Sequence, residues 1–118
     1  MSILTKVLAI LTGLEFIFIF YLETLATSSK RTAKVFHMEE RELSRDSVST
    51  LFKNQGVYNL LIGVLIFVAL YLKDARLLML LDVCIIIVAI FGSLTSSKDI
   101  ILKQGALAIL TLITLYLL

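Results

Sequence analysis

The sequence predicts an all-α integral membrane protein built as a bundle of four transmembrane helices. The 118-residue chain is 59% hydrophobic and has a mean hydropathy of +1.01, whereas a soluble domain is nearer half apolar. Four apolar runs occupy most of the chain, and each is close to the roughly 20 residues that cross a bilayer as a helix. Together they leave no room for a separate soluble domain. The predicted spans of this single domain are residues 3–27, 54–72, 77–95 and 100–118.

The first span is expected to be a retained helix. Lys6 gives it a weakly positive start, and Thr24-Leu25-Ala26 resembles a signal-peptide cleavage site. Glu15 and Glu23 argue against cleavage, because a signal peptide has a core of about 7 to 15 uninterrupted apolar residues. The two glutamates lie about 80° apart around an α-helix, so they border one broad face.

Residues 28–53 form the only long polar segment. Its middle, residues 33–43, fits either an interfacial helix with a ragged apolar side or a solvated loop of mixed charge. Asp46 or Ser47 suits the N-cap of the next helix, which is therefore expected to begin near Ser47. A helix from Ser47 to the end of the second span is about 39 Å long, so it projects from the hydrocarbon or tilts within it.

The third and fourth spans follow after short turns, so each is expected to lie antiparallel to the span before it. Thr-Ser-Ser-Lys ends both the first span (27–30) and the third (95–98), and Gln-Gly opens both the second (55–56) and the fourth (104–105). These repeated motifs indicate a duplicated helical hairpin. The alternative is that serine, threonine and lysine are simply common where helices leave a membrane.

Lysine and arginine counts predict the orientation. Six lie in the 28–53 loop and two, Lys98 and Lys103, lie around the turn into the fourth span, whereas the opposite side has only Lys6, Lys73 and Arg76. Eight against three places the long loop in the cytoplasm and both termini outside.

Each span also carries polar groups that lipid rejects, so these side chains are expected to converge inside the bundle. Gln55 and Asn59 share one helix face at i,i+4 spacing, and an amide both donates and accepts hydrogen bonds. The alternative for each group is a hydrogen bond that only sets helix register, and for Asp82 a salt bridge to Arg76 or Lys6. The predicted ligand-binding residues are Glu15, Gln55 and Asn59, with Glu23, Asn54, Tyr58 and Asp82 nearby.

No catalytic set is visible, so no catalytic residue, metal or cofactor is predicted and an enzyme is less expected than a binding protein. His37 and Cys84 are the only histidine and cysteine, which excludes an intramolecular disulfide. Nucleic acid is not an expected partner, because the basic residues flank the membrane without an aromatic-basic surface.

Several motifs are shared with one family. They are Glu15, Tyr21-Leu22-Glu23-Thr24, Lys34-Val35-Phe36, Asn54-Gln55-Gly56-Val57-Tyr58-Asn59, Ala89-Ile90-Phe91-Gly92-Ser93 and Gln104-Gly105. Together they resemble the bacterial membrane family called domain of unknown function 1304, over nearly the whole chain. The resemblance implies a small four-helix protein of the bacterial cytoplasmic membrane with no assigned activity. Phe16 and Ala26 replace a polar residue and a tryptophan of the family pattern, which argues against an imidazole acting beside Glu15.

The leading hypothesis is a homodimeric four-helix bundle that binds or transports a small polar or protonatable ligand through an internal polar pocket. One alternative is an accessory protein whose buried polar residues only specify helix packing. Another is a membrane enzyme acting on a lipid or quinone, which requires a lateral slot reaching Glu15 or Asp82.

Overall fold

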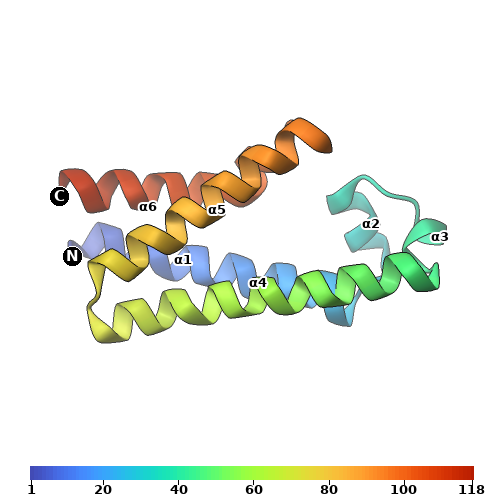
Figure 1. Ribbon diagram of the computed structural model, residues 1–118, viewed down its shortest axis with the longest axis horizontal. Helices are drawn as coiled ribbons and strands as arrows, with labels where there is room; N and C mark the ends of the chain where they lie inside the picture. The colour runs from blue at the N-terminus through green and yellow to red at the C-terminus, as the bar shows by residue number, and fades with distance from the viewer. The chain divides into compact units, whose positions relative to one another are not determined.

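The computed structural model describes residues 1–118, and every regular element in it is a helix. The prediction of an all-α protein is therefore confirmed. Two of the elements are single π-helical turns, η1 and η2, which the sequence analysis did not predict. The elements are α1 (Ile3–Phe20), η1 (Tyr21–Leu25), α2 (Lys30–Phe36), α3 (Glu40–Leu43), α4 (Asp46–Leu72), α5 (Ala75–Thr95), η2 (Ile101–Gly105) and α6 (Ala106–Leu117) (Figure 1).

Three helical segments are long and apolar enough to cross a membrane: Ile3–Leu25, Asp46–Leu72 and Ala75–Thr95. The fourth predicted span contains a shorter apolar helix, Ile101–Leu117. At 1.5 Å per residue this helix is about 25 Å long, less than the roughly 30 Å of a bilayer's hydrocarbon core. Three segments thus have the required length, and the fourth reaches across only where the bilayer thins around it.

The polar loop differs from both expectations for it. The second long helix begins at Asp46, as predicted, but residues 33–43 form neither one interfacial helix nor an open loop. They are divided by His37, whose φ of 55° places it in the left-handed region and ends α2. A left-handed residue at the helix end stops the α-helix and redirects the chain.

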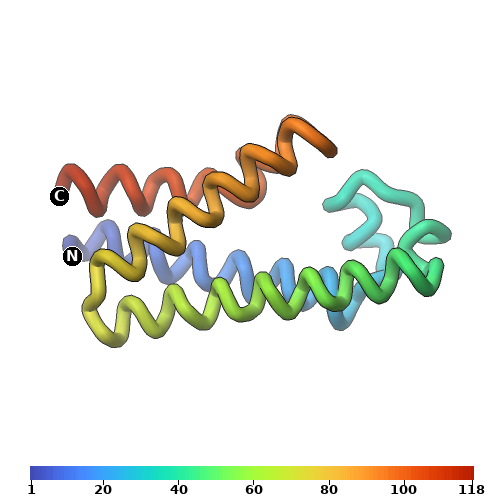
Figure 2. The backbone as a smooth tube through the Cα atoms, viewed as in Figure 1, coloured from blue at the N-terminus to red at the C-terminus, as the bar shows by residue number.

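The chain divides into two compact units, residues 1–15 with 64–118 and residues 16–63. In the first unit, the Thr5 hydroxyl donates to the Thr114 hydroxyl at 2.9 Å, and the Thr12 and Thr111 hydroxyls are 3.4 Å apart. The order of these pairs makes α1 and α6 antiparallel neighbours. The trace reverses between α5 and α6, so these two helices are also antiparallel (Figure 2).

In the second unit, short helices cover the end of the first long helix. The buried Thr32 hydroxyl shares its single proton between the carbonyls of Leu22 (3.0 Å) and Ala26 (2.7 Å). These carbonyls lie where the helix ends and would otherwise lack intrahelical partners. The rings of Phe36 and Phe52 meet edge to face, with centroids 5.2 Å apart, and so join α2 to α4.

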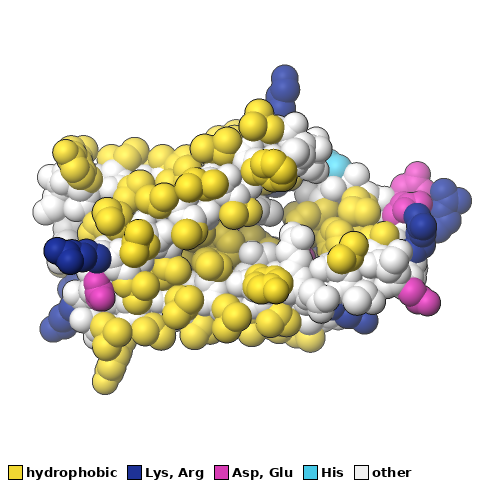
Figure 3. Space-filling model, viewed as in Figure 1, with side chains coloured by type: hydrophobic (Ala, Val, Ile, Leu, Met, Phe, Trp, Pro, Cys, Tyr) yellow, Lys and Arg dark blue, Asp and Glu magenta, His cyan; other side chains and the backbone are white.

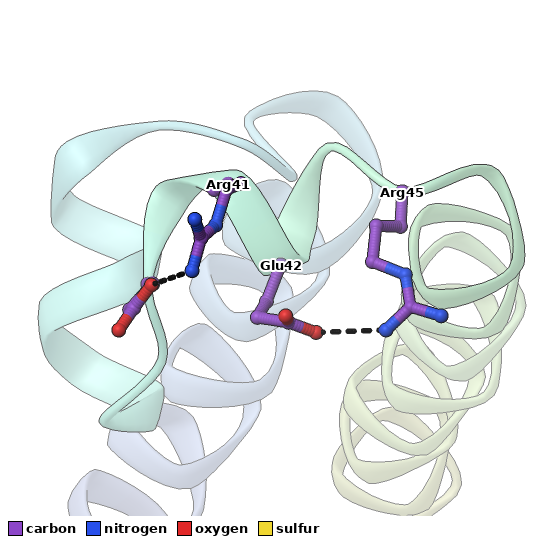
Figure 4. A network of polar contacts seen from close by, with 4 residues as sticks. Arg41, Glu42 and Arg45 are labelled. Carbon is purple, nitrogen blue, oxygen red and sulfur yellow. Dashed lines mark hydrogen bonds and ion pairs between the residues drawn. The ribbon is translucent and has the colours of Figure 1, made fainter.

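Ion pairs in this unit lie on the surface around α3. Arg41 binds Glu39 and Arg45 binds Glu42, each at 3.1 Å (Figure 4). Exposed pairs of this kind contribute about 0 to 1 kcal/mol. Each pair joins residues two or three apart in the sequence, so it stabilises the local conformation around α3.

The outer surfaces of the long helices are apolar. On the face shown in Figure 3, hydrophobic side chains run along these helices, while charged side chains gather at helix ends and around α3. Val88 is 66% exposed and Ile87 61% exposed on α5, and Leu61 is 52% exposed on α4. Helices with exposed apolar sides and buried polar groups suit a lipid environment, because lipid offers no water to solvate polar groups on the outer surface.

Candidate functional site

The structure pairs the two amides of α4 with a buried carboxyl. Glu23 lies in η1 and is 0% exposed. Its Oε2 accepts a hydrogen bond from the Gln55 side-chain amide at 2.7 Å, and its Oε1 accepts one from the Asn59 amide at 2.5 Å. The amides act together because they are four residues apart on one helix face. Glu15, which was expected to share a site with them, belongs to the other compact unit.

Gly56 lies between the two amide residues and allows this contact. A Cβ atom at position 56 would lie 1.9 Å from the Thr24 hydroxyl oxygen and 3.1 Å from the Glu23 Cβ. The same Thr24 hydroxyl donates to the Lys53 carbonyl at 2.9 Å. Only glycine leaves room for η1 at this distance from α4, so the amides reach Glu23 because position 56 has no side chain.

The turn that carries Glu23 is π-helical. The backbone N–H of Ala26 donates to the carbonyl of Tyr21 at 2.9 Å, a bond between residues five apart. Such a turn holds one more residue than an α-helical turn and so changes the face on which the next side chains lie. The 80° separation predicted for Glu15 and Glu23 assumed a regular α-helix, and the π-helical turn invalidates that estimate.

The other two polar residues of the α4 motif, Asn54 and Tyr58, lie outside the Glu23 contact. Both are exposed, Tyr58 by 72%. Together with Gln55, Leu51, Val57 and Leu61 they line a shallow hollow of about 620 Å³ on the outer side of α4. The motif therefore has two sides, one that binds Glu23 and one that is open at the surface.

A different arrangement surrounds Asp82 in α5. This residue is 0% exposed, yet neither carboxyl oxygen has a hydrogen-bond partner. The salt bridge considered for it with Arg76 or Lys6 is not formed. Arg76 precedes Asp82 by six residues, which on an α-helix is about 240° around the axis and 9 Å along it. Arg76 is exposed at the helix start, so the two side chains lie on different faces.

Helix packing places other polar atoms at the level of Asp82. A Cβ at Gly105 would lie 3.2 Å from the Cβ of Ala89, so these positions face each other across α5 and the last helical segment. Because the helices are antiparallel, two turns from that contact lead to Asp82 on one side and Leu112 on the other. Thr111, next to Leu112, is the residue whose hydroxyl meets Thr12 of α1.

Glu15 lies one turn beyond Thr12 on α1 and adds a fourth polar side chain to Asp82, Thr111 and Thr12. Glu15 is half-buried, and its Oε1 is buried without a hydrogen-bond partner. The structure thus leaves two carboxyls incompletely paired in one compact unit. The threonines that accompany them were missed by the sequence analysis. Thr5 and Thr12 repeat at seven residues within an apolar run, and this heptad spacing is the signal that would have found them.

Hollows between α5 and α6 are apolar. One of about 240 Å³ is lined by Arg76 and Tyr116 with aliphatic side chains, and a second of about 500 Å³ by Met79, Val83, Leu112, Ile113, Tyr116 and Leu117. Neither is lined by Asp82 or Glu15, so these hollows do not form the slot that the enzyme hypothesis requires. No three His, Cys, Asp or Glu side chains gather as a metal site would require.

Comparison with known proteins identifies the family. The family described as protein of unknown function (DUF1304) matches residues 10–116, which include both glutamates, the α4 motif and Asp82. The chain belongs to this family. It is also 57% identical over 116 residues to the uncharacterized protein YpaA of Lactococcus lactis subsp. lactis (strain IL1403), covering 97% of this chain and 98% of the relative. No solved structure matches the chain. The resemblance inferred from the motifs is confirmed.

Proposed function

We propose that this protein is a small multi-pass membrane protein that binds or transports a small polar or protonatable ligand, with Asp82 at the centre of its site. The observation that carries the proposal is the Asp82 carboxyl, fully buried with both oxygens unpaired. Leaving one buried polar group unsatisfied costs about 1 to 3 kcal/mol. Ionisable groups inside membrane helices are costly and generally mark functional sites.

A purely structural role does not account for Asp82. Buried polar residues that specify helix packing do so through the hydrogen bonds they make, and this carboxyl makes none. An apolar side chain of similar volume would fill the same space at less cost. A ligand that pairs with the carboxyl supplies the missing interaction, and Glu15 provides a second incompletely paired oxygen in the same unit.

The second candidate function is that of an accessory protein whose buried polar residues only specify helix packing. The hydrogen bonds of Glu23 to Gln55 and Asn59 favour this role for these three residues. Both oxygens of Glu23 are paired and the residue is fully buried, so its hydrogen bonds hold η1 against α4. Gln55 and Asn59 remain candidate ligand contacts, because each amide has a carbonyl oxygen and a second N–H beyond the bond to Glu23. Asn54 and Tyr58 are candidates on the exposed side of α4.

We further propose four spans, with the 28–53 segment in the bacterial cytoplasm and both termini outside. Support comes from the lysine and arginine counts and from three helices of sufficient length. The shorter Ile101–Leu117 helix crosses if the bilayer thins around it. The test is reagent labelling of Ser44→Cys and Ser2→Cys in a Cys84→Ser background in intact cells. Labelling at position 2 but not 44 fits this topology, and the reverse contradicts it.

We also propose that two copies associate through the exposed side of α4. Asn54 and Tyr58 are polar groups on a long apolar helix, and with Leu51, Val57 and Leu61 they border an open hollow. Polar side chains on such a surface are stabilised by hydrogen bonds to a neighbouring helix. Asn54→Leu is expected to lower the dimer fraction in mild detergent, and an unchanged monomer–dimer ratio would contradict this interface.

The ligand itself is tested by native mass spectrometry of the protein purified in mild detergent. The wild type is expected to retain a small molecule in stoichiometric amount, and Asp82→Asn is expected to lose it. Asp46→Asn is the matched control, because it makes the same chemical change at an exposed position. An empty wild-type protein that also fails to move solutes in proteoliposomes would exclude the binding role and leave the accessory reading.

A further inference from the structure

We infer that the ligand of the Asp82 site is an organic ammonium ion, a positively charged nitrogen with apolar substituents. The inference rests on the proposed function and names the chemical class of the ligand. It follows from the polar atoms that the site leaves available, from the charges near it and from its apolar walls.

The polar atoms at the level of Asp82 are hydrogen-bond acceptors. A threonine hydroxyl has one proton to donate. The Thr12 hydroxyl gives its proton to the Leu8 carbonyl at 2.8 Å, and the Thr111 hydroxyl gives its proton to the Leu107 carbonyl at 2.7 Å. What remains at both hydroxyls is acceptor capacity. The unpaired oxygens of Asp82 and Glu15 add further acceptors when the carboxyls are ionised. A ligand that complements the ionised carboxyls and these hydroxyls must donate hydrogen bonds or carry positive charge.

The protein supplies no cation of its own to Asp82. Lys103 is paired with Asp99 at 2.9 Å, and Lys6, Lys73, Arg76 and Lys98 are exposed. No ion pair joins any of them to Asp82. Arg76 borders only the smaller hollow, where its long side chain can extend toward the headgroup region. The buried carboxyls therefore lack the counter-charge that buried acids ordinarily have.

The surroundings of Asp82 suit an organic cation better than a metal ion. A hard metal ion takes about six or more oxygen ligands, whereas the structure brings no three acidic, histidine or cysteine side chains together. The neighbouring surface is apolar instead. Met79, one turn before Asp82, and Val83, the next residue, line the hollow of about 500 Å³ between α5 and α6. This volume lies in the range of small-molecule sites.

Apolar walls favour substituents on the nitrogen, because removing apolar surface from water stabilises binding by about 25 cal/mol per Å². Tyr116 also lines the hollow, and a phenol ring attracts a cation through its negative face. A charged nitrogen at Asp82 with an apolar group extending toward Met79 would match both the carboxyl and the separate apolar hollow. The ligand reaches Asp82 only if the helices separate, since the hollow does not include the carboxyl.

The test uses benzylammonium chloride as the probe, with sodium chloride at equal ionic strength and benzyl alcohol as the neutral analogue. Binding is measured by calorimetry in an uncharged detergent near pH 7, where the amine is charged. Wild type and the Asp46→Asn control are expected to bind benzylammonium at least tenfold more tightly than Asp82→Asn. Glu15→Gln is expected to weaken binding as well, and it provides the second variant if Asp82→Asn does not fold.

The outcomes separate this inference from the proposed function. Binding of benzyl alcohol or of sodium that depends on Asp82 in the same way would overturn the ammonium assignment and leave a ligand-binding role intact. If benzylammonium does not bind while native mass spectrometry finds another retained molecule, the ammonium assignment is likewise overturned and the ligand-binding role remains. No binding of any probe and no retained molecule would overturn both.

Discussion

Gly56 provides the most direct test of the contact between η1 and α4. In Gly56→Ala, the new Cβ would lie 1.9 Å from the Thr24 hydroxyl oxygen and 3.1 Å from the Cβ atoms of Glu23 and Thr24. Ordinary contact begins near 3.4 Å, so either Thr24 rotates or η1 moves away from α4 by more than 1 Å. Rotation breaks the Thr24–Lys53 hydrogen bond, and separation also lengthens the two bonds to Glu23.

The expected cost follows from these alternatives. Overpacking costs about 1 to 3 kcal/mol, and one lost hydrogen bond costs about 1 kcal/mol more. Replacing glycine by alanine inside a helix returns about 1 kcal/mol. The net destabilisation is therefore about 1 to 3 kcal/mol, measured as the free energy of unfolding in detergent micelles followed by circular dichroism.

A double-mutant cycle identifies the cause. In a Thr24→Ala background the closest clash is removed, so Gly56→Ala is expected to be nearly neutral, which gives a coupling of about 1 to 3 kcal/mol. Gly92→Ala is the control, because the atom nearest to its added Cβ would be the Cγ2 of Ile100 at 3.1 Å, without a contact as short as the one at position 56. The reasoning is refuted if Gly56→Ala costs nothing, or costs the same with and without Thr24.

Three further predictions concern buried polar groups. The double variant Glu23→Gln, Asn59→Asp is expected to lose about 0.5 to 3 kcal/mol less unfolding free energy than the two single variants lose together. The reason is that the exchange again places one hydrogen-bond donor opposite one acceptor. Additive changes in unfolding free energy would contradict the hydrogen bond. Thr32→Val is expected to destabilise the protein by about 1 to 3 kcal/mol, since two carbonyls lose their donor; an unchanged melting temperature would show that they find other partners. Asp82→Leu is expected to raise the melting temperature and abolish ligand retention together, as removal of an unpaired functional group commonly does; a lower melting temperature would indicate a partner for Asp82.

Helical periodicity predicts which polar residues share a face, but it does not predict the partner of that face. The i,i+4 spacing of Gln55 and Asn59 correctly predicted that they act on one face, and the glycine between them predicted close approach. The same reasoning grouped them with Glu15 and placed Glu23 only nearby, whereas their hydrogen bonds go to Glu23. A face is a property of one helix, whereas the partner of that face depends on how deep the neighbouring helix lies and on the extra residue in η1.

Sequence alone determined the all-helical class, three of the four predicted helices of membrane-spanning length, the start of α4 to within one residue and the family. These follow from local quantities, namely hydropathy over about 20 residues, capping residues and contiguous motifs. Tertiary structure alone decided that Glu23 is paired, that Asp82 is buried without a partner and that Thr12 and Thr111 meet. Each of these depends on the register between helices distant in the sequence, which the periodicity of a single apolar helix leaves undefined.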